Sequence, residues 1–478
     1  MEICRRKNHS KTVLIFVLLM TSFTLNHLSV RVSGVEPISL TLAYYDDWIP
    51  GNSFGFPGYV NTGNFTSREK DEILLISSIP EKTDVITLCY YNEGNLSADI
   101  SLDCDYSKAY QSCVGDFDGN GDLELFSSEE WSVSIGNHLG SQHKIYDVGD
   151  FTFIRNTSFY YSNPNAIIDR VNVFDYNSNG DDEIILATWD SDKKSELIRI
   201  YDYENNGDLV QITNISHAIT SEDFYFRTTV FVGIGDLTGN SSREIITVSQ
   251  WNTESNPSVF SSSYDLYSLN ENTNNISHIS TGLLNIIGTS VTVDITDMNH
   301  DSVDELLIYY DKTYSPKLVL YDLTNLAPIE KNIIIRSQSS YPNSGWFCNT
   351  LLISDLNNDS TTELIFSELN LDFEGNYIGR YEIYSYKNNV IESVLLQEIY
   401  NPPIASAIAD VDETDDLELV SVFNDYSLEN FLTKGGMEVW TVGYRSSGKS
   451  SISDNIVEII LLFTLPIILP IFSRKRKI

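Results

Sequence analysis

The chain has few basic residues, few cysteines and no apolar run in its central part long enough to cross a membrane. Its 478 residues include 30 Lys and Arg against 67 Asp and Glu, which gives a formal net charge of −37. The two ends, 1–34 and 455–478, hold nine basic and two acidic residues. The region between them therefore has 21 basic and 65 acidic residues and a net charge of −44. Such a surface repels polyanions, which excludes nucleic acid and anionic lipid as favourable partners.

Recognisable catalytic motifs are also missing. The sequence has no G-x-S-x-G, no H-E-x-x-H and no glycine loop of the kind that cradles phosphate. None of the central histidines stands in a ligand or nucleophile pattern. They are His138, His143, His217, His278 and His300, the last at an outward-pointing, non-ligand position. We therefore predict no catalytic residues and expect a protein that is not an enzyme.

Long apolar runs occur only near the ends. Three basic residues at 5–7 precede the apolar run VLIFVLLM at 13–20, and small and polar residues follow around Ser33. This order is typical of a secretory signal peptide, which we place over 1–34.

The C-terminal run predicts a membrane anchor. A Ser-rich linker at 446–455 leads into the apolar segment 456–472, which is just long enough to span a bilayer, and then into a basic tail at 473–478. The basic cluster favours a cytoplasmic tail and argues against a C-terminal signal that is removed. We expect a single-pass protein of the cell membrane whose central region, 35–445, faces outward.

An outward compartment permits disulfides and glycosylation. Four cysteines lie in the central region, and their spacing leaves both disulfide pairing and buried free thiols open; they are Cys89, Cys104, Cys113 and Cys348. Glycosylation sequons begin at Asn64, Asn95, Asn156, Asn214, Asn240, Asn275 and Asn358.

An acidic motif of nine residues recurs along the chain. It occurs seven times, always with glutamate at the ninth position, and it starts at Asn64, Asp116, Asp175, Asp236, Asp297, Asp355 and Asp410. Successive starts lie 52 to 61 residues apart. A unit that recurs at such a period is the signature of a solenoid, propeller or array.

Each glutamate begins a short apolar run rich in Ile, Val and aromatic residues, such as EIILATW at 183–189, which predicts a buried strand. Three more strand-like segments follow in each unit. Four strands in each of seven units predict an all-β, seven-bladed β-propeller, with an open solenoid as the alternative. The last unit is one strand short, and we expect residues 37–45 to supply it. Tryptophans at 131, 189 and 251 recur after their glutamates and are predicted to pack in blade cores, with sugar stacking as the alternative.

The loops predict calcium sites. Oxygen-bearing side chains at positions 1, 3, 5 and 9 can surround one hard cation, and Ca²⁺ takes six to eight oxygen ligands. The first loop, with Arg68 and Lys70 inside it, is expected to bind nothing. The predicted ligands are Asp116, Asp118, Asn120 and Glu124; Asp175, Asn177, Asn179 and Glu183; Asp236, Asn240 and Glu244; Asp297, Asn299, Asp301 and Glu305; Asp355, Asn357, Asp359 and Glu363; and Asp410, Asp412 and Glu418.

The loops DFDGNGDLELF and DYNSNGDDEIIL resemble FG-GAP/VCBS repeats, the blades of integrin-α-type propellers. The resemblance covers roughly residues 60–445. It implies one calcium ion per intact loop on one face of the ring and a partner on the opposite face. The chain departs from the family in having Glu at position 9, where Asp is commoner, and glycine at position 6 only as Gly121 and Gly180.

We therefore expect a calcium-stabilised, membrane-anchored propeller that binds an extracellular protein or glycan. A polysaccharide lyase or hydrolase built on a propeller is one alternative, and a structural component of the cell envelope is another. The enzyme would need a cluster of carboxylates, or of Tyr and Lys, at the central channel.

Overall fold

The computed structural model describes residues 38–444, apart from gaps that lie mainly in connections between strands. The predicted signal peptide (1–34), linker (446–455), membrane helix (456–472) and basic tail (473–478) lie outside the described residues. Within the described part, no helix has the length and apolar character needed to cross a membrane.

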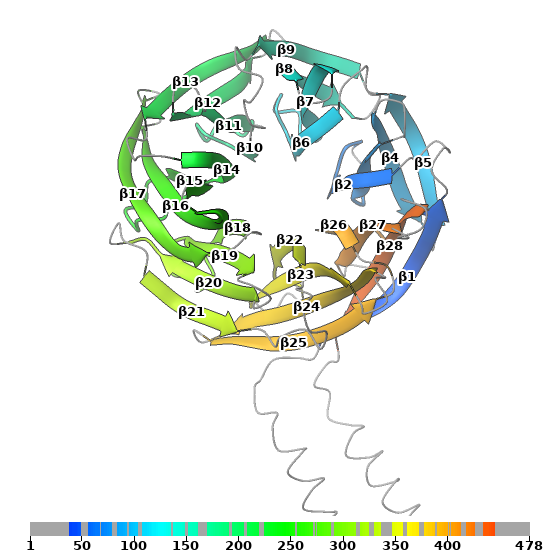
Figure 1. The fold of residues 1–478 in the computed structure, drawn as a ribbon. Helices are drawn as coiled ribbons and strands as arrows, with labels where there is room; N and C mark the ends of the chain where they lie inside the picture. The colour runs from blue at the N-terminus through cyan, green and yellow to red at the C-terminus, as the bar shows by residue number, and fades with distance from the viewer. Residues whose placement is uncertain are drawn as a thin grey trace, which may run out of the picture. The chain divides into compact units, whose positions relative to one another are not determined.

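The described residues form seven four-stranded antiparallel sheets arranged as the blades of a ring (Figure 1). Blades 1 to 3 comprise β2 (Phe56–Gly63), β3 (Glu72–Ser78), β4 (Asp84–Asn92) and β5 (Asn95–Asp103); β6 (Lys108–Gly115), β7 (Glu124–Ser134), β8 (Asn137–Asp147) and β9 (Thr152–Tyr160); β10 (Arg170–Phe174), β11 (Glu183–Asp190), β12 (Ser195–Glu204) and β13 (Asp208–Ala218). Blades 4 to 6 comprise β14 (Phe224–Gly235), β15 (Glu244–Thr253), β16 (Asn256–Asn270) and β17 (Asn275–Ile287); β18 (Val291–Thr296), β19 (Glu305–Asp311), β20 (Pro316–Asp322) and β21 (Ile329–Ile335); β22 (Phe347–Ser354), β23 (Thr362–Leu371), β24 (Tyr377–Lys387) and β25 (Val390–Ile399).

The seventh blade joins the two ends of the ring. It consists of β26 (Pro403–Ala409), β27 (Glu418–Asp425), β28 (Lys434–Tyr444) and, as its outermost strand, β1 (Ile38–Trp48). Strand β1 pairs antiparallel with β28 from Ile38 opposite Tyr444 to Trp48 opposite Gly435. The predicted closure by residues 37–45 is confirmed, and so is the seven-bladed propeller. The open solenoid is wrong, because the first and last strands share one sheet.

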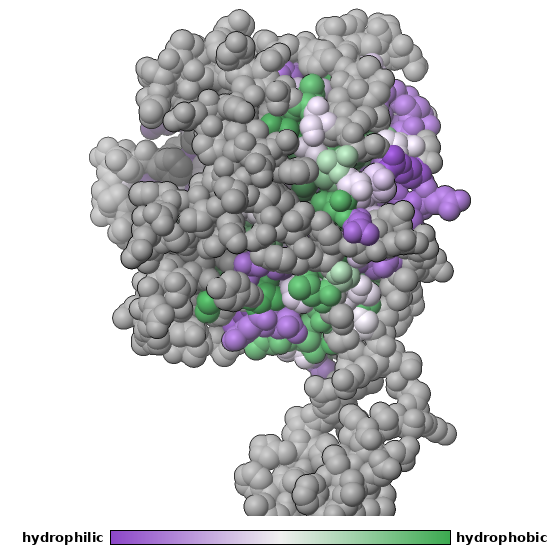
Figure 2. Space-filling model, turned by 90° about the vertical axis from the view of Figure 1, so that its right-hand side faces the viewer, coloured by the Kyte–Doolittle hydropathy of each residue, from purple (hydrophilic) through white to green (hydrophobic). Residues whose placement is uncertain are grey.

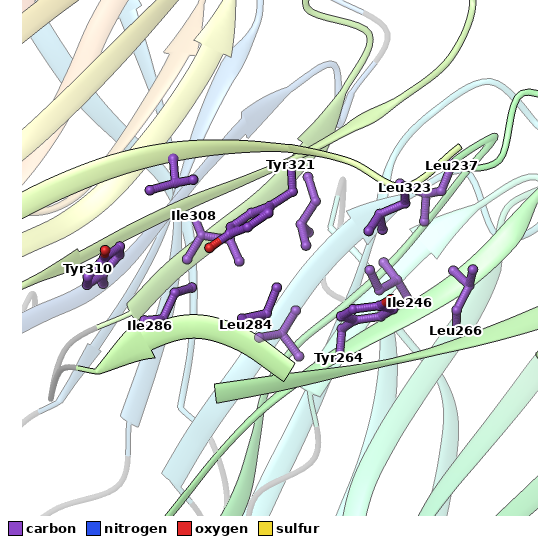
Figure 3. Packing of buried hydrophobic residues seen from close by; sticks show 13 residues of the cluster. Leu237, Ile246, Tyr264, Leu266, Leu284, Ile286, Ile308, Tyr310, Tyr321 and Leu323 are labelled. Carbon is purple, nitrogen blue, oxygen red and sulfur yellow. The ribbon is translucent and has the colours of Figure 1, made fainter. Parts of the chain in front are cut away.

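Apolar contacts between neighbouring blades hold the ring together. Second strands are buried on both faces, as in β11, where all residues but the last are buried. Seven clusters of buried side chains result in the described part, and each lies between two adjacent blades. Figure 3 shows the cluster between blades 4 and 5, to which Tyr264 and Leu266 of β16 and Ile308 and Tyr321 of blade 5 all belong. Each blade therefore depends on both neighbours for the burial of its apolar surface.

The outer strands carry the exposed apolar residues. Leu283 of β17 is 68% exposed and Leu396 of β25 is 56% exposed. A side view shows hydrophobic and hydrophilic residues interspersed in small patches on the wall of the ring (Figure 2). This mixture follows the alternation of an edge strand, whose side chains point in turn toward the blade core and toward solvent.

Two sequence questions are settled by side-chain placement. Cys89 and Cys113 are free thiols, so the pairings that would have included them do not form. Burial raises the pKa of Cys89 to about 12, which leaves this thiol protonated and unreactive. Trp189 is buried in β11, as predicted for core packing, and the Arg227 guanidinium lies 5.0 Å from the centre of its ring.

Candidate functional site

All seven acidic loops occupy the same place in their blades, between the innermost strand and the second strand. Because neighbouring strands alternate in direction and the blades repeat around one ring, these connections lie on one face, here called the loop face. The residue at position 2 is buried in every loop: Phe65, Phe117, Tyr176, Leu237, Met298, Leu356 and Val411. This apolar side chain anchors each loop in the core cluster below it.

The ninth-position glutamate closes each loop through a backbone hydrogen bond. Its Oε2 accepts from the amide of position 2 in all seven loops, for example from Phe117 at 2.7 Å and from Leu237 at 3.0 Å. These glutamates are at most 2% exposed. The recurrence of glutamate therefore has a structural cause that is independent of metal, and it explains why the first loop retains Glu72 although it has no acid at positions 1, 3 and 5.

Side-chain oxygens at positions 1 and 5 organise the outer part of the loop. In the loop at Asp116, the two carboxylate oxygens accept from the amides of Asn120 and Gly121 at 3.0 and 2.9 Å. The Asn120 side chain accepts in turn from the Asp122 amide at 2.7 Å. The loops at Asp175, Asp236 and Asp297 repeat this pattern. The backbone bends twice into the left-handed region in these four loops, at positions 4 and 6.

The loops are of two kinds, which differ in the residue at position 3. Where it is Asn or Thr, its side chain donates to Oε1 of the ninth-position glutamate, as Thr238 does to Glu244 at 2.9 Å; Asn177 and Asn299 do the same. Where it is Asp, two carboxylates face each other instead. The structure brings Asp116, Asp118 and Glu124 together in one cluster, with carboxylate oxygens within 4.8 Å of one another.

Electrostatics distinguish the Asp116 loop further. Burial, and next the charge of Asp118, raise the pKa of Glu124 to about 8. Burial is also the main cause of the raised pKa of Asp118. Carboxylates held this close without a cation repel one another, and a divalent ion relieves the repulsion. Three carboxylates and the Asn120 side chain supply the oxygen chemistry that Ca²⁺ requires, so these residues fit the ion.

The Asp410 loop also fits a cation, but with a competitor. Asp410, Asp412 and Glu418 form a second three-carboxylate cluster. Oε1 of Glu418 is buried and has no hydrogen-bond partner among the described residues, and burial with the nearby Asp412 raises the Glu418 pKa to about 7. However, Lys70 of blade 1 donates to both carboxylate oxygens of Asp410, at 2.9 and 2.8 Å. Residues 413–416 lie outside the described residues.

The first loop contains its own cation. Nε of Arg68 lies 3.4 Å from Oε1 of Glu72, and its guanidinium stacks 4.6 Å from the Tyr90 ring centre. A positive side chain thus stands beside the ninth-position glutamate. At this position the guanidinium would repel a metal ion, and the absence of a metal site in the first loop stays a prediction.

An additional acid beside the loops was not predicted. Asp147 of β8 pairs in register with Glu124, and its charge contributes to the raised pKa of Asp118. Asp202 of β12 acts in the same way on Glu183, whose pKa burial raises to about 8. The sequence signal is a Tyr-Asp pair at the end of the third strand, at 146–147, 201–202 and 321–322. A carboxylate on this strand adds to the negative potential at the loop.

Position 8 links neighbouring loops, a role that sequence reasoning also missed. The amide of the position-8 residue donates to the carbonyl of position 1 in the preceding blade, from Asp71 to Asp410, Leu123 to Asn64, Asp182 to Asp116, and Asp304 to Asp236. Where position 8 is Asp, its carboxylate accepts from that same position-1 residue. Arg243 makes the corresponding link to the Asp175 carbonyl through its side chain. The loops therefore form a hydrogen-bonded belt across these five blade junctions.

Three further features belong to the loop face. In the Asp355 loop, Asn357 and Asp359 lie outside the described residues, and only the bond from the Leu356 amide to Glu363 shows that this loop closes like the others. His300 is exposed at position 4, as predicted. A cavity of about 710 Å³ lies beside the loops of blades 3 to 5 and is lined in part by Asp236, Asp294 and Asp304.

Comparison with known proteins does not identify a family. No protein-family model matches the sequence, and no curated protein matches it. Among solved structures, the β-propeller domain of Nup133 from Vanderwaltozyma polyspora is similar at 12% identity and a TM-score of 0.45, over 87% of this chain and 99% of that one. A rhamnogalacturonan lyase from Bacillus licheniformis is similar at 11% identity and a TM-score of 0.36, over 81% and 90%. Scores and identities this low support no inference about function.

Proposed function

We propose that this chain is a calcium-stabilised β-propeller of the FG-GAP/VCBS type, anchored in the cell membrane, that binds a protein or glycan outside the cell. The observation that supports the calcium part is the cluster of Asp116, Asp118 and Glu124. Its three carboxylates converge at the loop face, and the loop contributes Asn120 as a further oxygen donor. Bound calcium would stabilise this loop by mass action, because the ion binds the folded state alone.

The side-chain contacts support a ranking of the predicted calcium loops. We propose the Asp116 loop as the principal site and the Asp410 loop as a second, weaker one, because Lys70 already neutralises Asp410. In the loops at Asp175, Asp236 and Asp297, donors from position 3 face the glutamate, so calcium would have to displace them. For these three loops we propose weaker binding.

The belt of inter-loop hydrogen bonds favours the opposite face for partner binding. The strands that flank the segments 161–169, 336–346 and 426–433 end on that face, and these segments themselves lie outside the described residues. Their sequences combine aromatic and polar residues, and 336–346 contains Tyr341 and Trp346 but no acid. Loops on a rigid scaffold commonly carry recognition, and aromatic residues with polar neighbours suit protein and sugar surfaces.

The proposals of secretion and of membrane anchoring are supported only by the sequences of the two ends of the chain, 1–34 and 456–472. The described ring begins at Ile38 and ends at Tyr444, and its seven core clusters use residues between these limits alone. A secreted segment of residues 35–454 should therefore fold without the predicted signal peptide and membrane helix. This segment is the reagent for the tests that follow.

The direct test is binding by the immobilised 35–454 segment to a glycan array and to detergent-solubilised cell-surface proteins, in millimolar calcium. We expect saturable retention of one ligand class that untagged segment competes away. Replacing 336–346 by a Gly-Ser linker of equal length should abolish retention without changing the melting temperature. Absence of any competed ligand would contradict the binding function, and release of sugar fragments from a polysaccharide would favour the lyase alternative.

A further inference from the structure

We propose that His217, Asp265 and His278 form a binding site for a transition-metal dication of the zinc class, between the outer parts of blades 3 and 4. His217 lies on β13, the outermost strand of blade 3. Asp265 and His278 lie on β16 and β17 of blade 4. Three strands from two blades therefore bring together two imidazoles and one carboxylate, far apart in sequence and separate from the acidic loops.

The distances are close to those of a metal site. Nε2 of His278 lies 3.5 Å from Oδ1 of Asp265, and Nε2 of His217 lies 3.9 Å from the same oxygen. Ligand atoms that share a tetrahedral Zn²⁺ at roughly 2.0–2.2 Å stand about 3.3–3.5 Å from one another. The two imidazoles are stacked with centres 3.8 Å apart and planes 12° apart. Coordination would therefore require shifts below about 1 Å together with a rotation of the rings about their side-chain bonds, so that both nitrogen lone pairs point at one ion.

Neighbouring side chains hold the carboxylate and the rings in place. Nη2 of Arg227 donates to Oδ2 of Asp265 at 3.2 Å, which leaves Oδ1 facing the imidazoles. Tyr267 packs edge-on against both rings. The Thr281 hydroxyl donates to Oδ1 of Asp265 and lies 2.9 Å from Nε2 of His278, so a bound metal would have to displace this hydroxyl from both ligand atoms. Supporting contacts of this kind orient ligands in metal sites.

The charge of the surroundings favours a cation. Asp265 and Glu196 are both fully buried, and Arg227 is the cation that faces them both among the described residues. The Glu196 carboxylate accepts hydrogen bonds from Thr229, Thr247 and Tyr267. Burial raises the pKa of Glu196. When Glu196 is ionised and the imidazoles are neutral, Asp265, Glu196 and Arg227 together carry one net negative charge in the interior, where an unpaired charge is costly. A dication at the histidines would compensate it.

The ligand types select the metal. Two nitrogens and one oxygen suit Zn²⁺ and its first-row neighbours, whereas Ca²⁺ requires an all-oxygen shell. The imidazole side chains are 24% and 25% exposed while Asp265 is 1% exposed, so a metal can enter from the outer wall. Three protein ligands leave a fourth position for water. Bound metal would tie together the outer strands of two blades, which belong to different sheets.

The test uses the chelator-treated 35–454 segment, titrated with Zn²⁺ in a calorimeter and with Co²⁺ as an optical probe, both in excess calcium. We expect one equivalent of Zn²⁺, a visible Co²⁺ spectrum of tetrahedral type, and a higher melting temperature with zinc. His217→Gln and His278→Gln should each lose that equivalent and the zinc-dependent shift. These imidazoles are partly exposed, so the variants should fold, which the calcium-dependent melting temperature verifies.

His300→Gln is the matched control, because this exposed histidine lies in a loop outside the cluster, and it should keep the zinc equivalent. Equal zinc binding by the wild type and by both cluster variants would overturn the proposal, as would a wild type that binds no Zn²⁺. Asp118→Asn should leave the zinc equivalent in place. The proposal of a zinc site and the proposal of calcium-binding loops are therefore tested independently of each other.

Discussion

Asp182 and Asp116 form a reciprocal pair across the junction of blades 2 and 3. The amide of Asp182 donates to the Asp116 carbonyl at 2.8 Å, and the amide of Asp116 donates to the Asp182 carboxylate at 3.1 Å. Asp304 and Asp236 repeat the pair at the junction of blades 4 and 5. Glycine precedes position 1 at both junctions, and a Cβ on Gly235 would clash with the Asp304 carboxylate. The acidic loops thus connect blades as well as offering metal ligands.

Removing the carboxylate of this pair should weaken the junction. Asp182→Ala leaves the half-buried Asp116 amide without its acceptor, and we expect a loss of about 1 kcal/mol in the free energy of unfolding, measured by denaturant titration in chelator. Asp181→Ala is the control, because its carboxylate accepts from Asn179 within its own loop. Equal losses for the two variants would show that the inter-blade bond contributes nothing specific.

The effect of Asp118→Asn on the stability of the protein should change sign when calcium is added. In chelator, the amide removes the repulsion with Glu124 and can donate to it, as Asn177 does to Glu183, so we expect stabilisation by about 0.5–1 kcal/mol. In calcium, the variant loses a ligand and should become less stable than the wild type. Melting temperatures under the two conditions test this. The same ranking in both would contradict a calcium site in this loop.

The reciprocal change is Asn299→Asp. It replaces the amide that donates to Glu305 by a carboxylate, which converts the Asp297 loop to the arrangement of the Asp116 loop. We expect lower stability in chelator and a larger calcium-dependent rise in melting temperature than in the wild type. A variant whose calcium response is unchanged would show that position 3 does not control metal binding.

Asp294 should make stability depend on pH. Burial raises its pKa from 3.8 to about 6, so the folded state binds the proton more tightly than the unfolded state does. Between about pH 4 and pH 6 the folded state therefore holds more protons, and stability falls as pH rises through this window. The full cost at pH 7 is about 1–2 kcal/mol after allowance for partial exposure.

Asp294→Asn should remove this cost. Asn172 occupies the equivalent position of blade 3, where its side chain accepts from the Val173 amide and donates to the Val232 carbonyl. The Asp294 carboxylate already accepts from the Ile295 amide at 2.8 Å, and the amide variant keeps this bond. We expect higher stability at pH 7 and little change at pH 4, by denaturant titration at both values. A variant destabilised at pH 7 would contradict the assignment.

Left-handed backbone at position 6 predicts opposite effects of glycine and alanine. Ser241 and Ser302 have φ values of 62° and 67°, which cost a non-glycine residue free energy. Ser302→Gly should stabilise the protein by about 0.5 kcal/mol, whereas Gly180→Ala should destabilise it by about 1 kcal/mol. A Cβ at Gly180 meets no atom within 4 Å, so its cost is conformational alone. Denaturant midpoints of both variants provide the measurement.

The fold could be predicted from the sequence because its structural unit recurs. The number of ninth-position glutamates equals the number of blades, and the strand missing from the last unit predicted that an N-terminal strand, β1, closes the ring. The site was harder to predict. Glutamate at position 9 was predicted as a metal ligand from its recurrence, but the recurrence also has a second cause, because its bond to the amide of position 2 is present in all seven loops.

The remaining site features depend on contacts between strands that no local pattern records. Asp182 acts on the preceding blade, and Lys70 reaches Asp410 across the closure of the ring, 340 residues away in sequence. His217 and His278 looked scattered because the residues between them form three strands of blade 4. Only the pairing of strands and the packing of adjacent blades bring such residues together.

Calcium bound at the Asp116 loop can be observed most directly in a crystal structure of the 35–454 segment grown in millimolar calcium, with anomalous scattering to identify the ion. The account predicts one ion bonded to oxygens of Asp116, Asp118 and Glu124 at about 2.3–2.6 Å. A well-ordered loop with no anomalous peak, in which these carboxylates face only one another and backbone amides, would contradict it.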